Sequence, residues 1–277
     1  MMPILDNHLH LQPRGRGPEA MKEFRKHGGT HAILSHMPYD EVPITCGEDW
    51  GPSYDITLEM AKKGQELAGV KMFTTVGPYP VLLIGLAEVH GVYDAKMIMV
   101  EGMEEAARYV REGKAIAIGE VGRPHFNVSQ DIMDASNEIL LHGMRLAKEV
   151  GCAIVIHAET ATVDTMEDLG SMADQVGLAR HRVVKHYCGP LVGEESRGLV
   201  PSVLASRSNI AEALSRNGPF LLETDYMDDP DRPGAVLGVH TVPKRVKAIA
   251  TTPEGEAAMW KVCKETPERT YGITIEL

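Results

Sequence analysis

Residues 153–157 read Ala-Ile-Val-Ile-His, an apolar run of the length of one β-strand that ends in an ionisable residue. A similar run, Ala-Ile-Ala-Ile-Gly-Glu, occupies residues 115–120, and a helical pattern at residues 132–150 lies between the two. A buried strand, a helix and a second buried strand in this order are typical of a parallel sheet covered by helices. The same alternation continues from this stretch in both directions along the chain.

The alternation predicts strands at residues 4–9, 31–36, 71–76, 115–120, 153–157, 183–186, 200–205 and 220–225. Helical patterns occupy residues 19–26, 57–67, 95–111, 132–150, 163–176 and 210–216. Eight parallel strands with intervening helices favour a closed barrel over an open, doubly wound sheet. We therefore expect an α/β protein with the (β/α)8 TIM barrel fold.

The length of 277 residues suits one such barrel, which needs about 250 residues. No proline-rich linker or internal repeat divides the chain, so we expect a single domain over residues 1–277. The helical pattern at about 251–277 predicts an amphipathic cover for the barrel. Long connections at 37–53 and 227–240 follow predicted strands on the face where barrel active sites lie, and we expect either lids or ordinary surface loops there.

Composition narrows the class of protein. Lys and Arg number 28 against 39 Asp and Glu, and a net charge of -11 repels a polyanion, so nucleic acid is a less favoured partner than a small molecule. The 4 cysteines form no C-x-x-C pair, which argues against a zinc knuckle or a disulfide framework. No signal sequence and no apolar run of about 18 residues occurs, so we expect a cytoplasmic protein without a membrane partner.

Side chains of the types that bind metals stand at the ends of several predicted strands. His8 and His10 end the first strand, and their spacing of two places both imidazoles on one face, close enough to chelate one ion. A single histidine at a strand end is more often structural than a ligand. Several such residues at the same end of different strands are improbable by coincidence, and they predict a divalent-metal site. The residues are His8, His10, Glu120, His157, His186 and Asp225.

In its motifs the sequence resembles the TatD-like metal-dependent hydrolases, a family of the amidohydrolase superfamily. The motifs are, in order, Asp6-Asn7-His8-Leu9-His10-Leu11, Ile118-Gly119-Glu120-Val121-Gly122, Ile156-His157, His186-Tyr187-Cys188 and Glu223-Thr224-Asp225. Arg269-Thr270-Tyr271-Gly272 resembles the closing segment of the family. The resemblance therefore covers essentially the whole chain.

This resemblance implies a binuclear metal centre with two divalent ions at the carboxyl-terminal face of a (β/α)8 barrel. Imidazoles with carboxylates suit Zn, Mn, Fe or Co, and a carboxylate-rich half-site can accept Mg. The ligands that the resemblance implies are His8, His10 and Asp225 for the first ion, His157 and His186 for the second, and Glu120 for both. A carboxylate can bridge two ions where an imidazole cannot. A carboxylate beside a bound water can also accept its proton. The implied catalytic residues are thus Asp225 and Glu120.

Departures from the family concentrate in the loops that would contact substrate. A Gly-x-His-Pro segment of many TatD-like enzymes reads Gly77-Pro78-Tyr79-Pro80 here, and Arg123-Pro124-His125 replaces the usual Leu-Asp after the glutamate motif. A guanidinium suits bidentate recognition of phosphate or carboxylate. Pro-Arg-Gly-Arg-Gly-Pro, at residues 13–18, is either an anion-binding loop or a solvated turn. The candidate substrate-binding residues are Arg14, Arg16, Tyr79, Arg123 and His125, and Glu223 is a candidate for orienting a ligand.

Together these features predict a hydrolase that activates water with two metal ions. A phosphoester is the first candidate substrate, because the resembled family is associated with deoxyribonuclease activity, and the acidic charge favours a small phosphorylated molecule. One alternative is amidohydrolase-type hydrolysis of a small ester, lactone or amide. A second is a catalytically weak barrel that uses its metal pocket to bind a ligand. No P-loop, dinucleotide fingerprint or G-x-S-x-G elbow supports a different class of enzyme.

Overall fold

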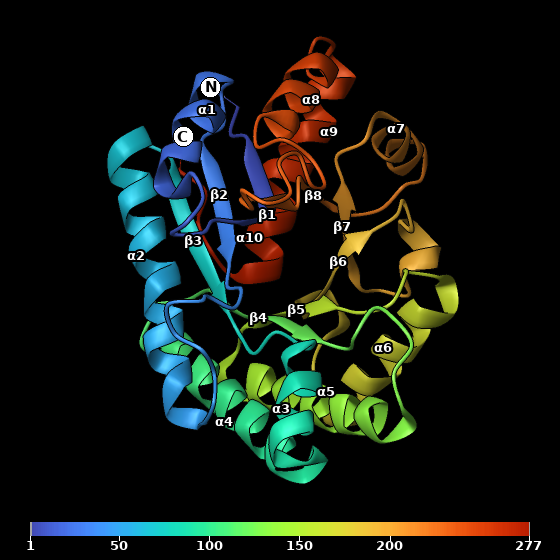
Figure 1. Cartoon of the computed structure of the whole chain (residues 1–277). Coiled ribbons are helices and arrows are strands. Elements are labelled where there is room, and N and C mark those ends of the chain that lie inside the picture. The colour runs from blue at the N-terminus through green and yellow to red at the C-terminus, as the bar shows by residue number, and fades with distance from the viewer. Residues whose placement is uncertain (1, 277) are drawn as a thin grey trace.

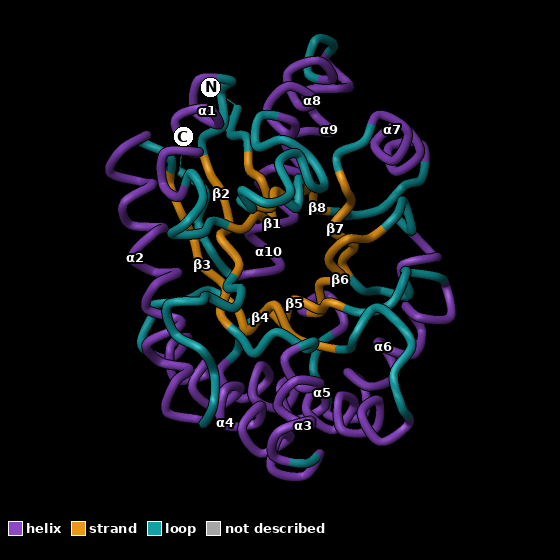
Figure 2. The backbone as a smooth tube through the Cα atoms, viewed as in Figure 1, coloured by secondary structure: helices purple, strands orange, loops and turns teal. Residues whose placement is uncertain are grey.

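A computed structural model of the chain describes residues 2–276. Its strands form a ring that is surrounded by helices (Figures 1 and 2). The strands are β1 (Leu5–His10), β2 (His31–Ser35), β3 (Lys71–Val76), β4 (Ala117–Gly122), β5 (Ala153–His157), β6 (Val183–Cys188), β7 (Val200–Leu204), β8 (Leu221–Glu223) and β9 (Tyr226–Met227). Every neighbouring pair of strands is parallel. The predicted strands are therefore present, each within a few residues of its expected bounds.

The ring closes between the last strand and the first. The order in the sheet is β8-β7-β6-β5-β4-β3-β2-β1-β9, and β9 follows β8 in the chain after only Thr224 and Asp225. The two short strands thus act as halves of one eighth strand, one half paired with β7 and the other with β1. Across the junction, the carboxylate of Asp6 accepts hydrogen bonds from the backbone N–H of Thr224 at 3.0 Å and from its hydroxyl at 2.7 Å. The expected (β/α)8 TIM barrel is confirmed.

Ten α-helices lie among the described residues. They are α1 (Ala20–Lys26), α2 (Trp50–Ala68), α3 (Leu82–His90), α4 (Val92–Arg111), α5 (Gln130–Val150), α6 (Val163–Val176), α7 (Arg207–Ser215), α8 (Thr241–Ile249), α9 (Pro253–Trp260) and α10 (Thr266–Tyr271). A π-helical turn at Lys261–Glu265 joins α9 to α10. This C-terminal run packs outside β1 and β8, where the hydroxyl of Tyr271 donates to Asn7 Oδ1 at 2.9 Å. None of the described helices has the length and apolar character that crossing a membrane requires.

One expectation about the connections was wrong in part. Residues 47–53 do not belong to a loop, because a 3-10 turn at Gly47–Asp49 leads into α2 at Trp50. The turn is stabilised by Asp49, whose carboxylate accepts from the backbone N–H groups of Thr45 at 2.7 Å and Cys46 at 3.0 Å. Only the first part of the expected lid is irregular. The structure also adds α3 and α8, which the sequence patterns did not indicate.

Helix α2 is anchored to α4 by Trp50. This side chain is fully buried, and its indole N–H donates to the backbone oxygen of Ile98 at 2.9 Å. The ring lies over Gly102 of α4, where a Cβ atom would approach a ring carbon of Trp50 to 2.6 Å. Gly102 therefore allows the close contact between the two helices.

A pair of glycine substitutions tests this packing. Alanine at Gly102 would overpack the contact, and we expect Gly102→Ala to lower the free energy of unfolding by about 1–2 kcal/mol despite the better helix propensity of alanine. Gly85 lies within α3 and has no atom within 4 Å of an added Cβ. Gly85→Ala should therefore raise the free energy of unfolding by about 0.5–1 kcal/mol. Urea unfolding measures both, and equal stabilisation by the two variants would contradict the packing described here.

Candidate metal centre

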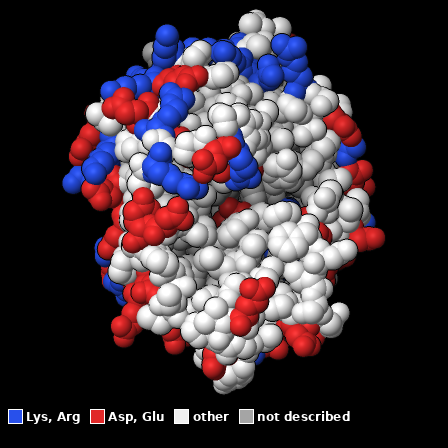
Figure 3. All heavy atoms as spheres, viewed as in Figure 1, with Lys and Arg blue, Asp and Glu red and all other residues white. Residues whose placement is uncertain are grey.

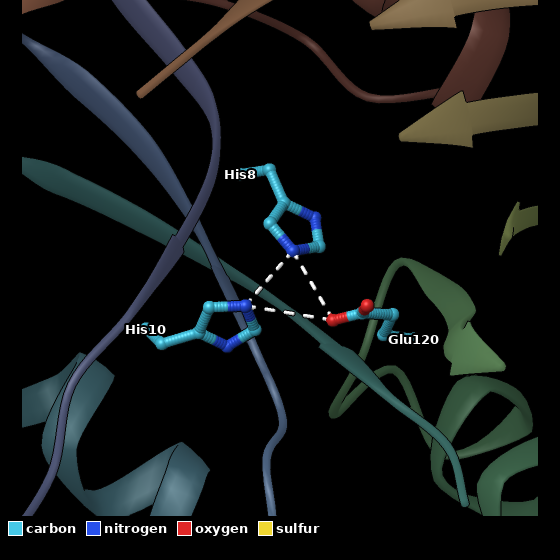
Figure 4. A group of neighbouring side chains, drawn as sticks. All are labelled: His8, His10 and Glu120. Atoms are coloured by element: carbon cyan, nitrogen blue, oxygen red, sulfur yellow. Dashed lines mark hydrogen bonds and ion pairs between the residues drawn. The ribbon is translucent and has the colours of Figure 1, made fainter. Parts of the chain in front are cut away.

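Three buried side chains from two strands converge at the carboxyl-terminal end of the barrel (Figure 4). His8 and His10 extend from β1, and their Nε2 atoms lie 3.0 Å apart. Glu120 extends from β4, and its Oε2 atom lies 3.3 Å from Nε2 of His8 and 3.5 Å from Nε2 of His10. The three donor atoms thus surround one point.

The second oxygen of Glu120 faces a different pair of imidazoles. Its Oε1 atom lies 2.5 Å from Nδ1 of His157 on β5 and 3.1 Å from Nε2 of His186 on β6. Asp225, between β8 and β9, completes the first group with its Oδ1 atom 3.5 Å from Nε2 of His10. The structure therefore brings together all the residues that the sequence predicted as metal ligands, and Glu120 lies between two groups of them.

The imidazoles on β1 are oriented by Ser35, the last residue of β2. Nδ1 of His10 lies 3.1 Å from the backbone oxygen of Ser35. Because a carbonyl oxygen only accepts, the proton of the neutral ring is on Nδ1 and the lone pair on Nε2 faces Glu120. Nδ1 of His8 lies 3.0 Å from the hydroxyl of Ser35. Histidines that bind metals are held in this way by hydrogen bonds to their outer nitrogen.

Glu223 of β8 plays the same part for His186. Its Oε1 atom lies 3.3 Å from Nδ1 of His186 in an ion-pair contact, although the angle there is too poor for a hydrogen bond. The carboxylate also accepts from the backbone N–H of Tyr187 at 2.6 Å and from the hydroxyl of Ser202. Glu223 is fully buried, and its charge favours a proton on Nδ1 of His186. The lone pair on Nε2 then faces Glu120.

The donor atoms are spaced as a bound cation requires. Ligands about 2.1 Å from a tetrahedral zinc ion are about 3.4 Å apart, close to the separations between His8, His10 and Glu120. The groups His8, His10 and Glu120, and Glu120, His157 and His186, each offer donor atoms within 4.8 Å of one another. Imidazole lone pairs that face each other and a carboxylate repel unless a cation lies between them. The residues therefore fit divalent metal ions.

Both carboxylates at the centre are ionised. Burial raises the pKa of Glu120, but the charges that His186 and His157 carry when they are protonated outweigh it and hold this pKa well below the ordinary value. Burial likewise raises the pKa of Asp225, but the contact with His10 at 3.5 Å and the charge that His186 carries when it is protonated bring this pKa below its ordinary value. Two anionic side chains thus face the imidazoles in the barrel.

Tyr79 and His125 lie against the centre from the loops after β3 and β4. The ring of Tyr79 is 5.3 Å from the ring of His157, nearly perpendicular to it. Nδ1 of His125 is 2.8 Å from Nε2 of His157, the nitrogen that faces away from Glu120. Both side chains are therefore adjacent to a predicted ligand.

Arg123 does not reach toward the centre. Its guanidinium donates to Asn137 Oδ1 at 2.6 Å, to Glu159 Oε1 at 3.1 Å and to Asp168 Oδ2 at 2.6 Å. These partners belong to α5, the loop after β5, and α6. Arg123 is buried among them and ties these elements together behind His157.

The two arginines after β1 also have partners within the chain. Arg16 pairs with Glu23 at 2.8 Å. The guanidinium of Arg14 lies 3.3 Å from a carboxylate oxygen of Asp40 and 3.5 Å from one of Asp231. Arg14 thus joins three loops at the mouth of the barrel.

The glycine-rich turn between these arginines does bind an anion, but the anion is Asp228 of the same chain. The backbone N–H groups of Gln12, Arg16 and Gly17 donate to the carboxylate of Asp228 at 3.3, 2.9 and 2.6 Å. A Cβ atom at Gly15 would lie 2.5 Å from this carboxylate, so the glycine permits the approach. These hydrogen bonds hold Asp228, at the start of the 227–240 connection, against the turn.

Sequence reasoning missed Ser35 and Asp228. Ser35 is the last residue but one of a predicted strand, close to where the ligands lie in theirs, and that position is the one signal that could have identified it. The partners of Asp228 are backbone groups more than 200 residues away, and no spacing in the sequence indicates them.

The face that carries the centre is hollowed. Figure 3 shows acidic atoms at the bottom of the hollow, with Lys and Arg atoms gathered along its upper edge. The lower and right-hand walls of the hollow are mostly uncharged in this view. A hollow with acidic atoms at its bottom therefore opens on this face.

Comparisons with known proteins show the family of this chain. A family model described as TatD related DNase matches residues 5–272. An uncharacterised protein of Methanocaldococcus jannaschii is 39% identical over 281 residues, which cover 100% of this chain and 98% of that protein. This relative extends the similarity to the full length of both chains.

Solved structures show the same fold. A TatD-like protein from Archaeoglobus fulgidus gives a TM-score of 0.66 at 17% identity, over 97% of this chain and 100% of that one. A TatD homologue from Escherichia coli gives a TM-score of 0.66 at 17% identity, over 98% of each chain. A phosphotriesterase homology protein from E. coli, complexed with phosphate in its active site, gives 0.58 at 13% identity over 98% of this chain and 99% of that one. With the family model matched from the first strand to the last helix, the chain belongs to the TatD related DNase family.

Proposed function

We propose that this protein hydrolyses a small phosphoester with a water molecule that is activated at a two-metal centre. The observation that carries the proposal is the position of Glu120, whose two oxygens face separate groups of imidazoles. His8, His10 and Asp225 would hold one ion, and His157 and His186 the other, with Glu120 between them. Two divalent ions in such a site lower the pKa of water and neutralise charge on an ester oxygen.

The side chain best placed to move a proton is Asp225. It is ionised, it lies at the rim of the first group of ligands, and its own backbone N–H donates to the oxygen of His8 at 3.0 Å. A carboxylate fixed in this position can accept the proton of an attacking water at Oδ1. The backbone of Asp225 has φ of 46°, a conformation that is uncommon outside glycine. Such strain often marks a functional position.

Tyr79 and His125 would contact the substrate beside His157. Both lie against a proposed ligand, and neither has the set of partners that commits Arg123, Arg14 and Arg16 to the protein. A small substrate is favoured because the net charge is -11 and because the arginines at the mouth are already paired with carboxylates. The family description and the phosphate-bound E. coli protein of the same fold support a phosphorus centre.

Replacement of the bridging carboxylate tests the proposal. We expect Glu120→Gln to lower the metal content and to reduce kcat/KM by at least about 100-fold. Replacement of a residue that only orients a metal ligand already lowers metal affinity or activity by about 10–100-fold. Bound metal is measured by elemental analysis, and turnover with 4-nitrophenyl phosphate and bis(4-nitrophenyl) phosphate. Glu112→Gln is the matched control, since Glu112 is exposed and pairs with Arg108 and Lys114 at the surface. Full metal content and full turnover in Glu120→Gln would refute the scheme.

The role of Glu223 predicts an effect on metal affinity alone. Glu223→Gln keeps the size of the side chain and an acceptor for Tyr187, but it removes the charge beside Nδ1 of His186. We expect the dissociation constant of the ion that His157 and His186 would hold to rise by about 10–100-fold. Competition with a chromogenic chelator measures it. Ser202→Ala removes one hydrogen bond to the same carboxylate and leaves its charge, so it should have a smaller effect. An unchanged dissociation constant in Glu223→Gln would argue against this positioning role.

A further inference from the structure

One half of the wall around the metal centre has almost no charge. It is formed by the loops after β3, β4, β5 and β6, which are residues 77–81, 123–129, 158–162 and 189–192. Within these four loops, all of them described by the structure, the Asp, Glu, Lys and Arg side chains are Arg123 and Glu159. These two pair with each other at 3.1 Å. A ligand that touches this half therefore meets no free formal charge from its Asp, Glu, Lys or Arg side chains.

Aromatic rings stand along the same half. Tyr79 packs 5.3 Å from the ring of His157. Phe126 packs 5.1 Å from the ring of His125, which in turn contacts His157. Tyr187 follows His186 directly, with the rings 6.0 Å apart. Each aromatic ring is thus at most one side chain away from an imidazole of the centre.

Two of these rings are strongly exposed. Phe126 is 47% exposed and Tyr187 is 50% exposed. Large apolar side chains gain free energy when a partner covers them, so exposed rings around a functional hollow are typical of a binding surface. Tyr187 also has φ of 49°, and its backbone N–H is held by Glu223. The same carboxylate that orients His186 therefore also fixes the backbone of Tyr187.

The opposite half of the mouth has a different character. The loops after β1, β2 and β9 carry Arg14 and Arg232 together with Asp40, Asp229 and Asp231. The cations are paired: Arg232 contacts Asp229 at 2.8 Å, and Arg14 contacts the other two aspartates. In Figure 3 most of the charged atoms around the hollow lie along its upper and left-hand edges. A row of free cations that could follow the phosphates of a polynucleotide does not occur at this mouth among the described residues.

We propose that the wall formed by Tyr79, Phe126 and Tyr187 binds a planar, uncharged aromatic group of a small substrate, whose ester group lies at the metal centre. This inference rests on the proposed hydrolase function. Stacking and edge contacts with aromatic side chains recognise any planar ring, and they need no charge on it. The ring is either a benzyl-type group or the base of a single nucleotide, because both present the same flat apolar faces.

Two phosphonates test whether the protein binds a ring because it is aromatic rather than because of its size or the charge of the ligand. Benzylphosphonate and cyclohexylmethylphosphonate have the same carbon count and the same charged group, and neither is hydrolysed. We expect calorimetry with the metal-loaded protein to show about 10-fold tighter binding of benzylphosphonate, the effect of stacking one ring. Competition with bound benzylphosphonate then identifies the ring. If thymidine 5′-monophosphate displaces it at a lower concentration than benzyl phosphate does, the ring is a nucleobase. If benzyl phosphate displaces it at the lower concentration, the ring is a benzyl-type group.

Variants test which residues cause the tighter binding of benzylphosphonate. Phe126→Leu and Tyr187→Leu keep apolar bulk but remove a ring, and each should bring the ratio of the two dissociation constants toward one. Tyr93→Leu is the control, because Tyr93 is 70% exposed on α4 and belongs neither to the four loops nor to β6. Circular dichroism spectra verify that all three variants fold. If Tyr93→Leu lowers the ratio as much as Phe126→Leu does, the assignment to this wall is wrong.

Three results would overturn the inference. They are equal affinity of the wild type for the two phosphonates, no change of the ratio in Phe126→Leu and Tyr187→Leu, and affinity for oligothymidylates that rises steadily with length beyond two nucleotides. Because the phosphonates report binding alone, the inference and the proposed function can fail separately. Hydrolysis of phosphate esters without discrimination between the phosphonates refutes the aromatic wall only. Absence of hydrolysis by the metal-loaded protein refutes the proposed function.

Discussion

The carboxylate of Glu120 is buried to 2% exposure at the end of the barrel, and four imidazoles face its two oxygens. This arrangement constrains the rest of the structure, because it requires side chains from β1, β4, β5 and β6 to meet at one place. A closed barrel satisfies the requirement, since the carboxyl ends of all its strands meet at one face. Lone pairs that face one another at these separations repel unless a proton or a metal ion lies between them.

The contacts that close the barrel also position Asp225, the last of the candidate ligands. Thr224 and Asp225 interrupt the eighth strand, and the hydrogen bonds from Thr224 to Asp6 hold the break against β1. The backbone N–H of Asp225 donates to the oxygen of His8 at 3.0 Å, which directs its carboxylate toward the imidazoles of β1. The positive φ of Asp225 belongs to this break between β8 and β9. The carboxylate proposed as the proton acceptor is thus fixed by the same contacts that complete the fold.

The barrel and its candidate ligands were predictable because their signals are local. His157 ends a five-residue apolar strand, and His8 and His10 alternate with apolar residues along another, so strand pattern and ligand type coincide. The substrate-side residues were less predictable, because their roles depend on partners far along the chain. Arg123 suggested an anion site, but Asn137 and Asp168 on two later helices occupy its guanidinium. Helix α2 begins early because Trp50 is buried against α4, a contact that helical periodicity does not reveal.

Anomalous X-ray diffraction from crystals of the metal-loaded protein tests the central claim most directly. The account predicts two anomalous peaks in the barrel, one among His8, His10 and Asp225 and one beside His157 and His186, with one oxygen of Glu120 in contact with each. A single peak, or two peaks of which Glu120 contacts at most one, would contradict it.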